Sequence, residues 1–146
     1  MIHEFSWSGW TPWEKLSAID VSTLNPGPGN YVIAAARPLA RAHGIDRYGL
    51  LTIGESSGLQ QRIRDFIRCA TREGQEGHIA GWRYNYFGFD SVFPFKSLLI
   101  RWQAAESKAE ANKIEAQTMR SYLDDHFELP PLNYKFNWSG WDGENI

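Results

Sequence analysis

Five residues of different types, spread through the chain, are the strongest candidates for chemistry: Tyr31, Arg62, His78, Glu115 and Asn133. A single carboxylate suits a hard cation such as Mg²⁺, which keeps several waters and takes further ligands from a substrate phosphate. A nearby arginine would neutralise charge on a phosphoryl group in its transition state. A tyrosine or histidine could take a proton from water if its pKa were lowered. These side chains would act together only if the fold gathered them around one cavity.

Several other kinds of chemistry have no support in the sequence. No pair of carboxylates suited to acid–base work declares itself, no Ser/His/Asp arrangement can be argued from spacing, and there is no glycine-rich phosphate loop. Cys69 is the one cysteine, which excludes an internal disulfide and argues against a cysteine-based zinc site. The expected compartment is therefore a reducing cytoplasm, with association with the nucleoid left open.

Composition indicates one globular domain over residues 1–146. The chain is 42% hydrophobic and 22% charged, a balance that argues against intrinsic disorder. No apolar run approaches the length of a membrane-spanning helix, and residues 1–7 lack the basic and apolar regions of a signal peptide. We therefore expect neither a membrane span nor a secretory leader.

Charge is spread unevenly, although the net charge is only −2. Residues 37–72 carry seven arginines against three acids, a surplus of four positive charges. Residues 106–128 carry three bases against six acids, a deficit of three. This asymmetry indicates either a phosphate-facing surface beside a metal-holding carboxylate or an ordinary solvated surface, and charge alone does not choose between them.

The pattern of turns and apolar residues predicts an α+β fold with a small three-stranded, mostly antiparallel sheet flanked by helices. Predicted strands cover residues 30–36, 48–53 and 97–102, the first after the Pro-Gly turn at 25–29. A helix is predicted over 59–70 with Ser56 or Ser57 as its N-cap, and a second over 104–127. Residues 74–94 are predicted to be a loop packed with aromatic side chains.

Helical spacing places two of the candidate residues at the margins of buried faces. Arg62 lies at the edge of the apolar face of the first helix, while Arg64 and Arg68 point away from it. Glu115 flanks the predicted core stripe of the second helix. That stripe consists of Ala105, Ala109, Asn112, Ala116, Met119, Leu123 and Phe127.

One internal repeat joins the two ends of the chain. Phe-Ser-Trp-Ser-Gly-Trp at 5–10 recurs as Phe-Asn-Trp-Ser-Gly-Trp at 136–141, identical at five of six positions. We read residues 1–24 and 134–146 as Trp-rich extensions of a core over 29–133. The repeat predicts similar contacts at both ends. The tryptophans would be buried against one another or in a homodimer, with stacking on unpaired bases as the alternative.

The ordered motifs resemble those of the GIY-YIG nuclease domain family. Gly29-Asn30-Tyr31-Val32-Ile33 matches its first strand motif, Thr52-Ile53-Gly54 its second, and Arg62 follows Gly54 by eight residues on the next helix. Three further elements match: His78-Ile79-Ala80-Gly81, Glu115 after the strand at 98–102, and the closing Leu129-Pro130-Pro131-Leu132-Asn133. The resemblance covers 29–133, and each motif alone is weak whereas the ordered set is more specific.

The resemblance implies a hydrolase: an endonuclease that cleaves a DNA phosphodiester with one Mg²⁺ or Mn²⁺ ion, leaving a 5′ phosphate and a 3′ hydroxyl. Tyr31 would be the general base and Arg62 would stabilise the pentacovalent phosphate. Glu115 would hold the metal ion, His78 would assist proton transfer or grip phosphate, and Asn133 would order the loop on the metal side. The glycines of the motifs (Gly29, Gly54 and Gly81) would serve backbone geometry.

One departure from the family pattern bears on activity. Thr52 stands where the second motif has its tyrosine, and threonine is too short to take the same place. Activity would then be reduced, absent, or rescued by Tyr48 or Tyr84. The predicted substrate contacts are Thr52, Arg64, Arg68 and Tyr48.

Two rival functions stay open at this stage. The first is a catalytically degenerate module that binds DNA or RNA, suggested by Thr52 together with the retained arginines. The second is a protein-interaction domain that uses the Trp-rich ends, with a merely structural core. The target sequence, the biological pathway and the oligomeric state lie beyond the sequence.

Overall fold

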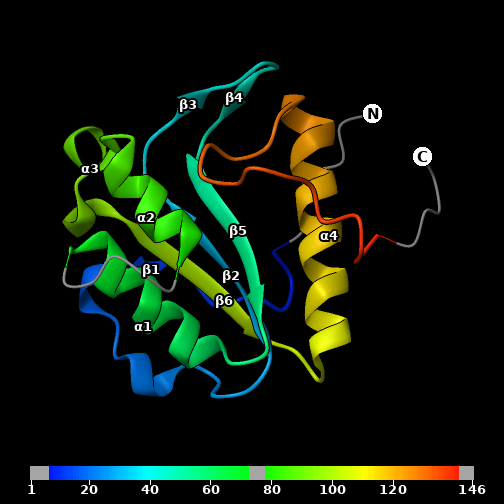
Figure 1. Cartoon of the computed structure of the whole chain (residues 1–146). Coiled ribbons are helices and arrows are strands. Elements are labelled where there is room, and N and C mark those ends of the chain that lie inside the picture. The colour runs from blue at the N-terminus through cyan, green and yellow to red at the C-terminus, as the bar shows by residue number, and fades with distance from the viewer. Residues whose placement is uncertain (1–6, 73–77, 142–146) are drawn as a thin grey trace.

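A four-stranded antiparallel sheet lies between two layers of helices in the computed structural model, which describes residues 7–72 and 78–141 (Figure 1). The strands follow the order β1 (Glu14–Lys15), β6 (Leu99–Ala104), β2 (Gly29–Ala34) and β5 (Leu50–Ser56). Helices α1 (Leu59–Ala70) and α2 (Ile79–Tyr86) cover one face, and α4 (Lys108–His126) covers the other. No helix among these described residues is long and apolar enough to cross a membrane.

Short elements complete the chain. Within the described residues, a two-stranded hairpin joins β2 to β5, helix α3 follows α2, and three 3₁₀ turns lie between β1 and β2 and before β6. Their bounds are β3 (Leu39–Ala40), β4 (Ile45–Asp46), α3 (Phe89–Val92), η1 (Leu16–Ala18), η2 (Val21–Thr23) and η3 (Phe95–Ser97).

The central strand β2 positions the first candidate residue. Every residue of β2 is buried, because the strand is paired on both edges and covered on both faces. Alternation along a strand sends successive side chains to opposite faces. Tyr31 therefore lies on the α1 and α2 face, with Gly54 and Trp102 as its pairing partners, whereas Val32 packs on the α4 face.

The α+β class is confirmed, but the predicted three-stranded sheet is wrong by one strand. The three predicted core strands are present, and β2 and β5 pair antiparallel as expected. The fourth strand, β1, is only two residues long, and both residues are exposed. Such a segment has no apolar alternation, so sequence periodicity does not detect it.

The helix over 59–70 is confirmed with its apolar face, although its cap differs from the prediction. The N-cap is Gly58, and no side chain caps the helix. Ser56 instead accepts a hydrogen bond from the Gly58 amide at 3.0 Å, one step before the helix begins.

The predicted loop over 74–94 contains two helices, α2 and α3, and so this prediction was wrong. Apolar residues lie on both faces of α2, which removes the one-sided period that marks an amphipathic helix. Position 81, inside α2, is a glycine, and a Cβ there would lie only 2.9 Å from the Cys69 Cβ. Helices α1 and α2 therefore pack closely at this point.

The predicted core stripe of the second long helix was partly wrong. This helix, α4, begins at Lys108 and not at 104, because β6 continues through Ala104. Ala109 and Phe127, both predicted to be core residues, are exposed. The buried residues of α4 are Ala111, Ala116, Thr118, Met119 and Tyr122.

The prediction of similar contacts at the two Trp-rich ends is confirmed in part: Trp7, Trp10 and Trp13 of the first segment and Phe136 of the second pack against the same buried cluster, although the segments also contact different elements. Residues 7–13 pack on β6, where the Arg101 guanidinium lies 4.8 Å from the Trp7 ring and 4.7 Å from the Trp13 ring. The second segment packs on α4, with the Arg120 guanidinium 5.4 Å from the Trp141 ring. Residues 5 and 6 of the first copy lie outside the described part of the chain.

Candidate functional site

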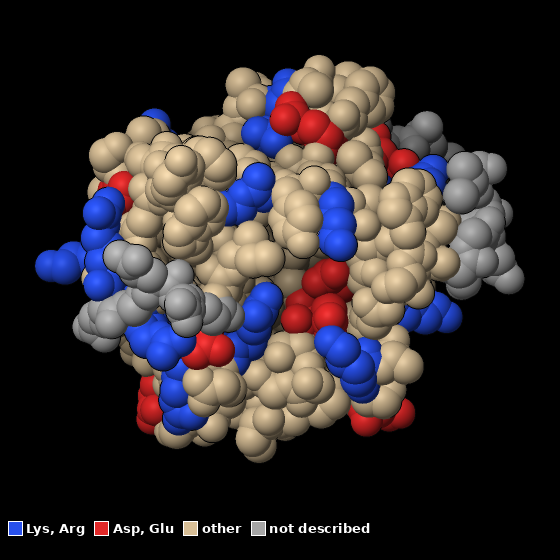
Figure 2. All heavy atoms as spheres, in the orientation of Figure 1, with Lys and Arg blue, Asp and Glu red and all other residues tan. Residues whose placement is uncertain are grey.

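A pocket of about 460 Å³ opens where β2, β5, α1, α2 and α4 approach the segment 132–139. All five residues singled out for chemistry line it: Tyr31, Arg62, His78, Glu115 and Asn133. On this face of the molecule, acidic atoms gather near the centre with Lys and Arg side chains around them (Figure 2). The fold thus brings together side chains that are separated by up to a hundred residues in the chain.

Tyr31 and His78 form the buried base of the pocket. The Tyr31 hydroxyl lies 2.8 Å from His78 Nε2. The other ring nitrogen, Nδ1, accepts a hydrogen bond from the Gly81 amide at 3.3 Å and so caps α2. Because a neutral imidazole carries one proton, Nδ1 as acceptor assigns that proton to Nε2. His78 therefore donates to the Tyr31 oxygen.

Arg62 acts electrostatically on both members of this pair. Burial raises the pKa of Tyr31 to about 12, and the charge and hydrogen bond of Arg62 oppose that rise. Burial lowers the pKa of His78 to about 3, and the Arg62 charge adds to this effect. His78 is consequently neutral near pH 7, and the Tyr31 oxygen faces two donors.

Gly54 makes room for the Tyr31 ring. A Cβ at Gly54 would lie 2.2 Å from Tyr31 Cζ and 2.3 Å from the hydroxyl oxygen. Since real Cβ atoms do not approach other atoms so closely, any side chain here would displace the phenol. Gly29 is similarly confined, because its Cβ would lie 2.7 Å from the Gln103 carbonyl oxygen.

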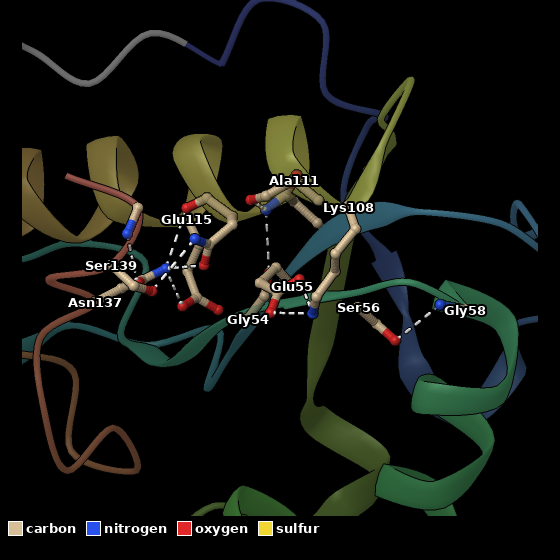
Figure 3. A network of polar contacts seen from close by, with 12 residues as sticks. Gly54, Glu55, Ser56, Gly58, Lys108, Ala111, Glu115, Asn137 and Ser139 are labelled. Atoms are coloured by element: carbon tan, nitrogen blue, oxygen red, sulfur yellow. Dashed lines mark hydrogen bonds and ion pairs between the residues drawn. The ribbon is translucent and has the colours of Figure 1, made fainter. Parts of the chain in front are cut away.

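Glu115 approaches the pocket from α4 as a half-buried carboxyl group. Burial, together with the negative charge of Glu55, raises the pKa of Glu115 to about 7. Asn137 donates a hydrogen bond to Glu115 Oε1 at 2.9 Å and opposes this rise. Glu55 itself is held by Lys108, whose Nζ lies 2.7 Å from both carboxylate oxygens (Figure 3).

The carboxylates of the pocket limit which metal ions it could hold. Within residues 7–72 and 78–141, no group of three or more His, Cys, Asp or Glu is arranged to hold a metal. These described residues therefore do not provide the three or four protein ligands that a zinc ion takes. Mg²⁺ and Mn²⁺ need only one or two protein carboxylates. Glu115 and Glu55, which line the pocket and repel each other electrostatically, are the residues that would hold such an ion.

Asn133 fastens the segment that forms one wall of the pocket. Its side-chain oxygen accepts from the Ile53 amide and its nitrogen donates to the Ile53 carbonyl, both at 2.9 Å. The Leu132 amide donates to the Leu51 carbonyl at 2.8 Å. The oxygen and the nitrogen of the Asn133 side-chain amide are thus both bonded to the Ile53 backbone, so this residue positions the wall segment of the pocket.

Of the predicted substrate contacts, only Thr52 lines the pocket. Arg64 and Arg68 lie together beside Val21, and Arg68 forms an ion pair with Asp65 at 3.4 Å. Tyr48 lines a separate pocket near Trp7.

Tyr84, the other tyrosine considered as a replacement for the missing motif tyrosine, does not line the pocket. It is buried, and its hydroxyl donates to the Phe93 carbonyl.

Sequence reasoning missed several residues of the pocket. Glu55 directly follows the second motif, and this adjacency was a usable signal. Asn112 lies nearly one turn before Glu115 on α4, and its position was assigned to the core. Asn137 and Trp138 come from the second Trp-rich segment, whose return to α4 no local pattern indicates.

The chain was compared with protein-family models, with curated proteins and with solved structures, and no match was found.

Proposed function

We propose that this protein is a divalent-metal-dependent endonuclease that hydrolyses DNA phosphodiester bonds in the manner of the GIY-YIG family. One observation carries the proposal. The Tyr31 oxygen receives His78 and Arg62 as donors in the same pocket that holds Glu115. A phenol, a guanidinium and a carboxylate around one polar cavity are suited to phosphoryl transfer.

The order of elements supports the same proposal. The first motif lies on the central strand β2, the second on its neighbour β5, and Arg62 on the helix that follows β5. The spacing of eight residues between Gly54 and Arg62 turns the arginine back toward Tyr31. The resemblance in sequence therefore corresponds to residues that meet in space.

The chemistry assigned to each side chain follows from its surroundings. Arg62 would bind the phosphate and balance the negative charge that develops in the transition state. Tyr31, as its phenolate, would accept the proton of the attacking water. His78 would hold the Tyr31 oxygen in place by donating a hydrogen bond to it from Nε2–H. A divalent ion held by Glu115 would supply positive charge, which lowers the pKa of nearby water and of the phenol.

The bond changes balance as a simple hydrolysis. With Tyr31 ionised to its phenolate before the attack, the water oxygen forms a bond to phosphorus and one of its protons passes to the phenolate oxygen, which later returns it to solvent. The bond from phosphorus to the 3′ oxygen breaks, and that oxygen takes a proton from solvent. The products are a 5′ phosphate and a 3′ hydroxyl.

The test is cleavage of supercoiled plasmid by the purified protein with Mg²⁺ or Mn²⁺. We expect Arg62→Gln and Glu115→Gln each to lower the rate at least ~100-fold. Arg64→Gln is the matched control, because Arg64 lies on the same helix but outside the pocket. Equal rates for Arg62→Gln and Arg64→Gln would overturn the assigned mechanism.

A nucleic-acid-binding module without catalysis is the second candidate, and Thr52 favours it. Thr52 is buried against the pocket, where the family pattern has a longer phenol. This candidate predicts salt-sensitive binding of DNA with no cleavage under either metal. Cleavage gained by Thr52→Tyr would favour this candidate over an active wild-type enzyme.

A further inference from the structure

Helix α2 presents an apolar stripe to solvent next to the pocket. Ile79, Trp82 and Tyr86 are separated by three and four residues, so they share one face of the helix. Tyr86 is 68% exposed and Trp82 43% exposed, whereas Ala80, Gly81 and Tyr84 of the opposite face are buried. Large exposed apolar stripes of this kind mark binding surfaces.

Two rings on this stripe stack on each other, and a third lies nearly perpendicular to them. Trp82 and Tyr86 stack with their centroids 4.5 Å apart and an interplanar angle of 16°. Phe87 meets the edge of Tyr86 at 5.2 Å and extends the surface. Tyr134 and Trp138, which line the pocket, are also exposed. We call these five aromatic residues the aromatic strip.

Cations lie between the rings of the aromatic strip. The Arg83 guanidinium lies 5.5 Å from the Phe87 ring and 5.3 Å from the Tyr134 ring. Lys135 Nζ lies 5.6 Å from the Tyr134 ring. Flat rings interleaved with positive charge are the features with which proteins hold single-stranded nucleic acid.

The aromatic strip runs into the pocket. Two members of the strip, Tyr134 and Trp138, line the pocket that also contains Arg62 and Glu115. Ile79, on the exposed face of α2, and Lys135 line it as well. A strand with its phosphate at Arg62 would therefore lay its neighbouring nucleotides across these rings.

We infer that the aromatic strip stacks the unpaired bases of the substrate, so that the preferred substrate carries a single-stranded segment beside the cleaved bond. Base faces within a duplex are covered by their neighbours, and only unpaired bases can stack on protein rings. This inference rests on the proposed function, because it takes the pocket to be the phosphate site. Trp, Tyr and Arg also occur in protein interfaces, and a protein partner is therefore an outcome of the test.

The experiment compares binding of three labelled DNAs without metal by fluorescence anisotropy: a single strand, a blunt duplex of the same sequence and a duplex with a single-stranded flap. We expect the single strand and the flap to bind more tightly than the duplex. The variant Trp82→Ala/Tyr86→Ala should weaken binding of both by about tenfold or more and leave the blunt duplex unchanged. Val92→Ala, another exposed apolar residue on neighbouring α3, should change none of the three.

The outcomes separate the strip from the pocket. Equal weakening of all three DNAs in the double variant, or no preference for unpaired bases in the wild type, would overturn the inference. If plasmid cleavage still depends on Arg62 in that case, the proposed function survives. Loss of self-association by light scattering with DNA binding intact would assign the strip to a protein partner and also overturn the inference. Because Trp82 and Tyr86 are exposed, thermal unfolding should be nearly unchanged and serves as the folding check.

Discussion

Two buried phenols on opposite faces of the sheet differ in the charge that they meet. Tyr122, on α4, donates to Asp46 Oδ2 at 2.7 Å, and Asp46 also accepts from the amides of residues 48–50. Tyr31, on β2, faces His78 and Arg62 instead. Each phenol lies beside its own pocket, and the pocket near Tyr122 is larger, at about 630 Å³ against 460 Å³.

The comparison teaches that neighbouring charges of opposite sign act in opposite directions on the pKa values of two buried phenols. Burial raises the pKa of both phenols. Asp46 raises the pKa of Tyr122 further and holds its proton, whereas Arg62 pulls the pKa of Tyr31 down. Tyr122 thus links α4 to the β3–β4 hairpin. Tyr31, with a pKa of about 12, keeps its proton near pH 7 and would need further positive charge besides Arg62 to release it.

The largest expected effect comes from removing each hydroxyl in turn. Tyr31→Phe should lower the cleavage rate by roughly 10²–10⁴-fold, because it removes the proposed general base. Tyr122→Phe should leave cleavage unchanged but lower the free energy of unfolding by about 1–3 kcal/mol, since Asp46 loses a hydrogen bond. Plasmid cleavage and urea unfolding measure the two effects. If both variants lost activity to the same degree, the distinction between the two phenols would be lost.

The next effect tests how tightly Tyr31 is positioned. Gly54→Ala should displace the ring, because the new Cβ would lie 2.2 Å from Tyr31 Cζ. We expect a destabilisation of about 1–3 kcal/mol and a clear loss of cleavage. Gly27→Ala is the control, because its Cβ would meet Asn25 Nδ2 at an ordinary 3.6 Å. A Gly54→Ala protein with wild-type stability and rate would show that the ring position is not critical.

A smaller effect concerns the pH dependence of stability. The pKa of Glu115 is about 7 in the folded protein and 4.5 ordinarily, so the folded state holds the proton more tightly. Glu115 should therefore increase the free energy of unfolding fully below pH 4.5, and this increase should disappear as the pH rises to about 7. Because glutamine carries no charge to bury, the Glu115→Gln variant should have a higher free energy of unfolding than wild type above pH 7, by on the order of 2 kcal/mol.

His78 contributes a pH dependence of the opposite sign. Its pKa of about 3 in the fold, against 6.5 ordinarily, lowers stability as pH falls below 6.5. Both proteins share this contribution, so the difference between the Glu115→Gln and wild-type curves isolates the carboxyl group. A difference that did not vary with pH would contradict the raised pKa of Glu115.

The smallest expected effect is that of Asn137. Its hydrogen bond to Glu115 lowers the pKa of that group, so Asn137→Ala should raise it slightly. Because a metal ion binds the deprotonated carboxylate, the pH midpoint of Mn²⁺ binding should move upward by less than about one pH unit. Ser139→Ala, which leaves the Asn137 bond to Glu115 intact, is the control in Mn²⁺ titrations. A downward shift in Asn137→Ala would contradict the assignment.

The sequence predicted those parts of the fold that local periodicity determines. The strands around Tyr31 and Thr52 and the helix bearing Arg62 have strong apolar patterns, and all three are present. Helix α2 was missed because its apolar residues serve two surfaces, a buried one and an exposed one. The buried face of α4 was predicted incorrectly because residues far away in the sequence determine which side of the helix is covered. Asn30, for example, donates a hydrogen bond to the Ala111 carbonyl at 2.8 Å.

The candidate site divides in the same way. Tyr31, Arg62 and Glu115 lie in ordered motifs, so their spacing could be read, and all three line one pocket. Asn137 reaches Glu115 only because the segment after α4 folds back along the helix, and this path depends on tertiary packing. Asn133 was expected to order its loop, and the structure shows that its side chain pairs with the backbone of Ile53, a partner that the sequence alone does not indicate.

The contact of Leu132 and Asn133 with β5 has a consequence for behaviour in concentrated solution. β5 is an outer strand of the sheet, and the unoccupied amides and carbonyls of an outer strand recruit strands from other molecules. Leu132 and Asn133 occupy these groups at residues 51 and 53, and the opposite border, β1, is too short to recruit a partner. Damage to the 129–133 segment would therefore open a path to fibrous aggregates as well as removing a wall of the pocket.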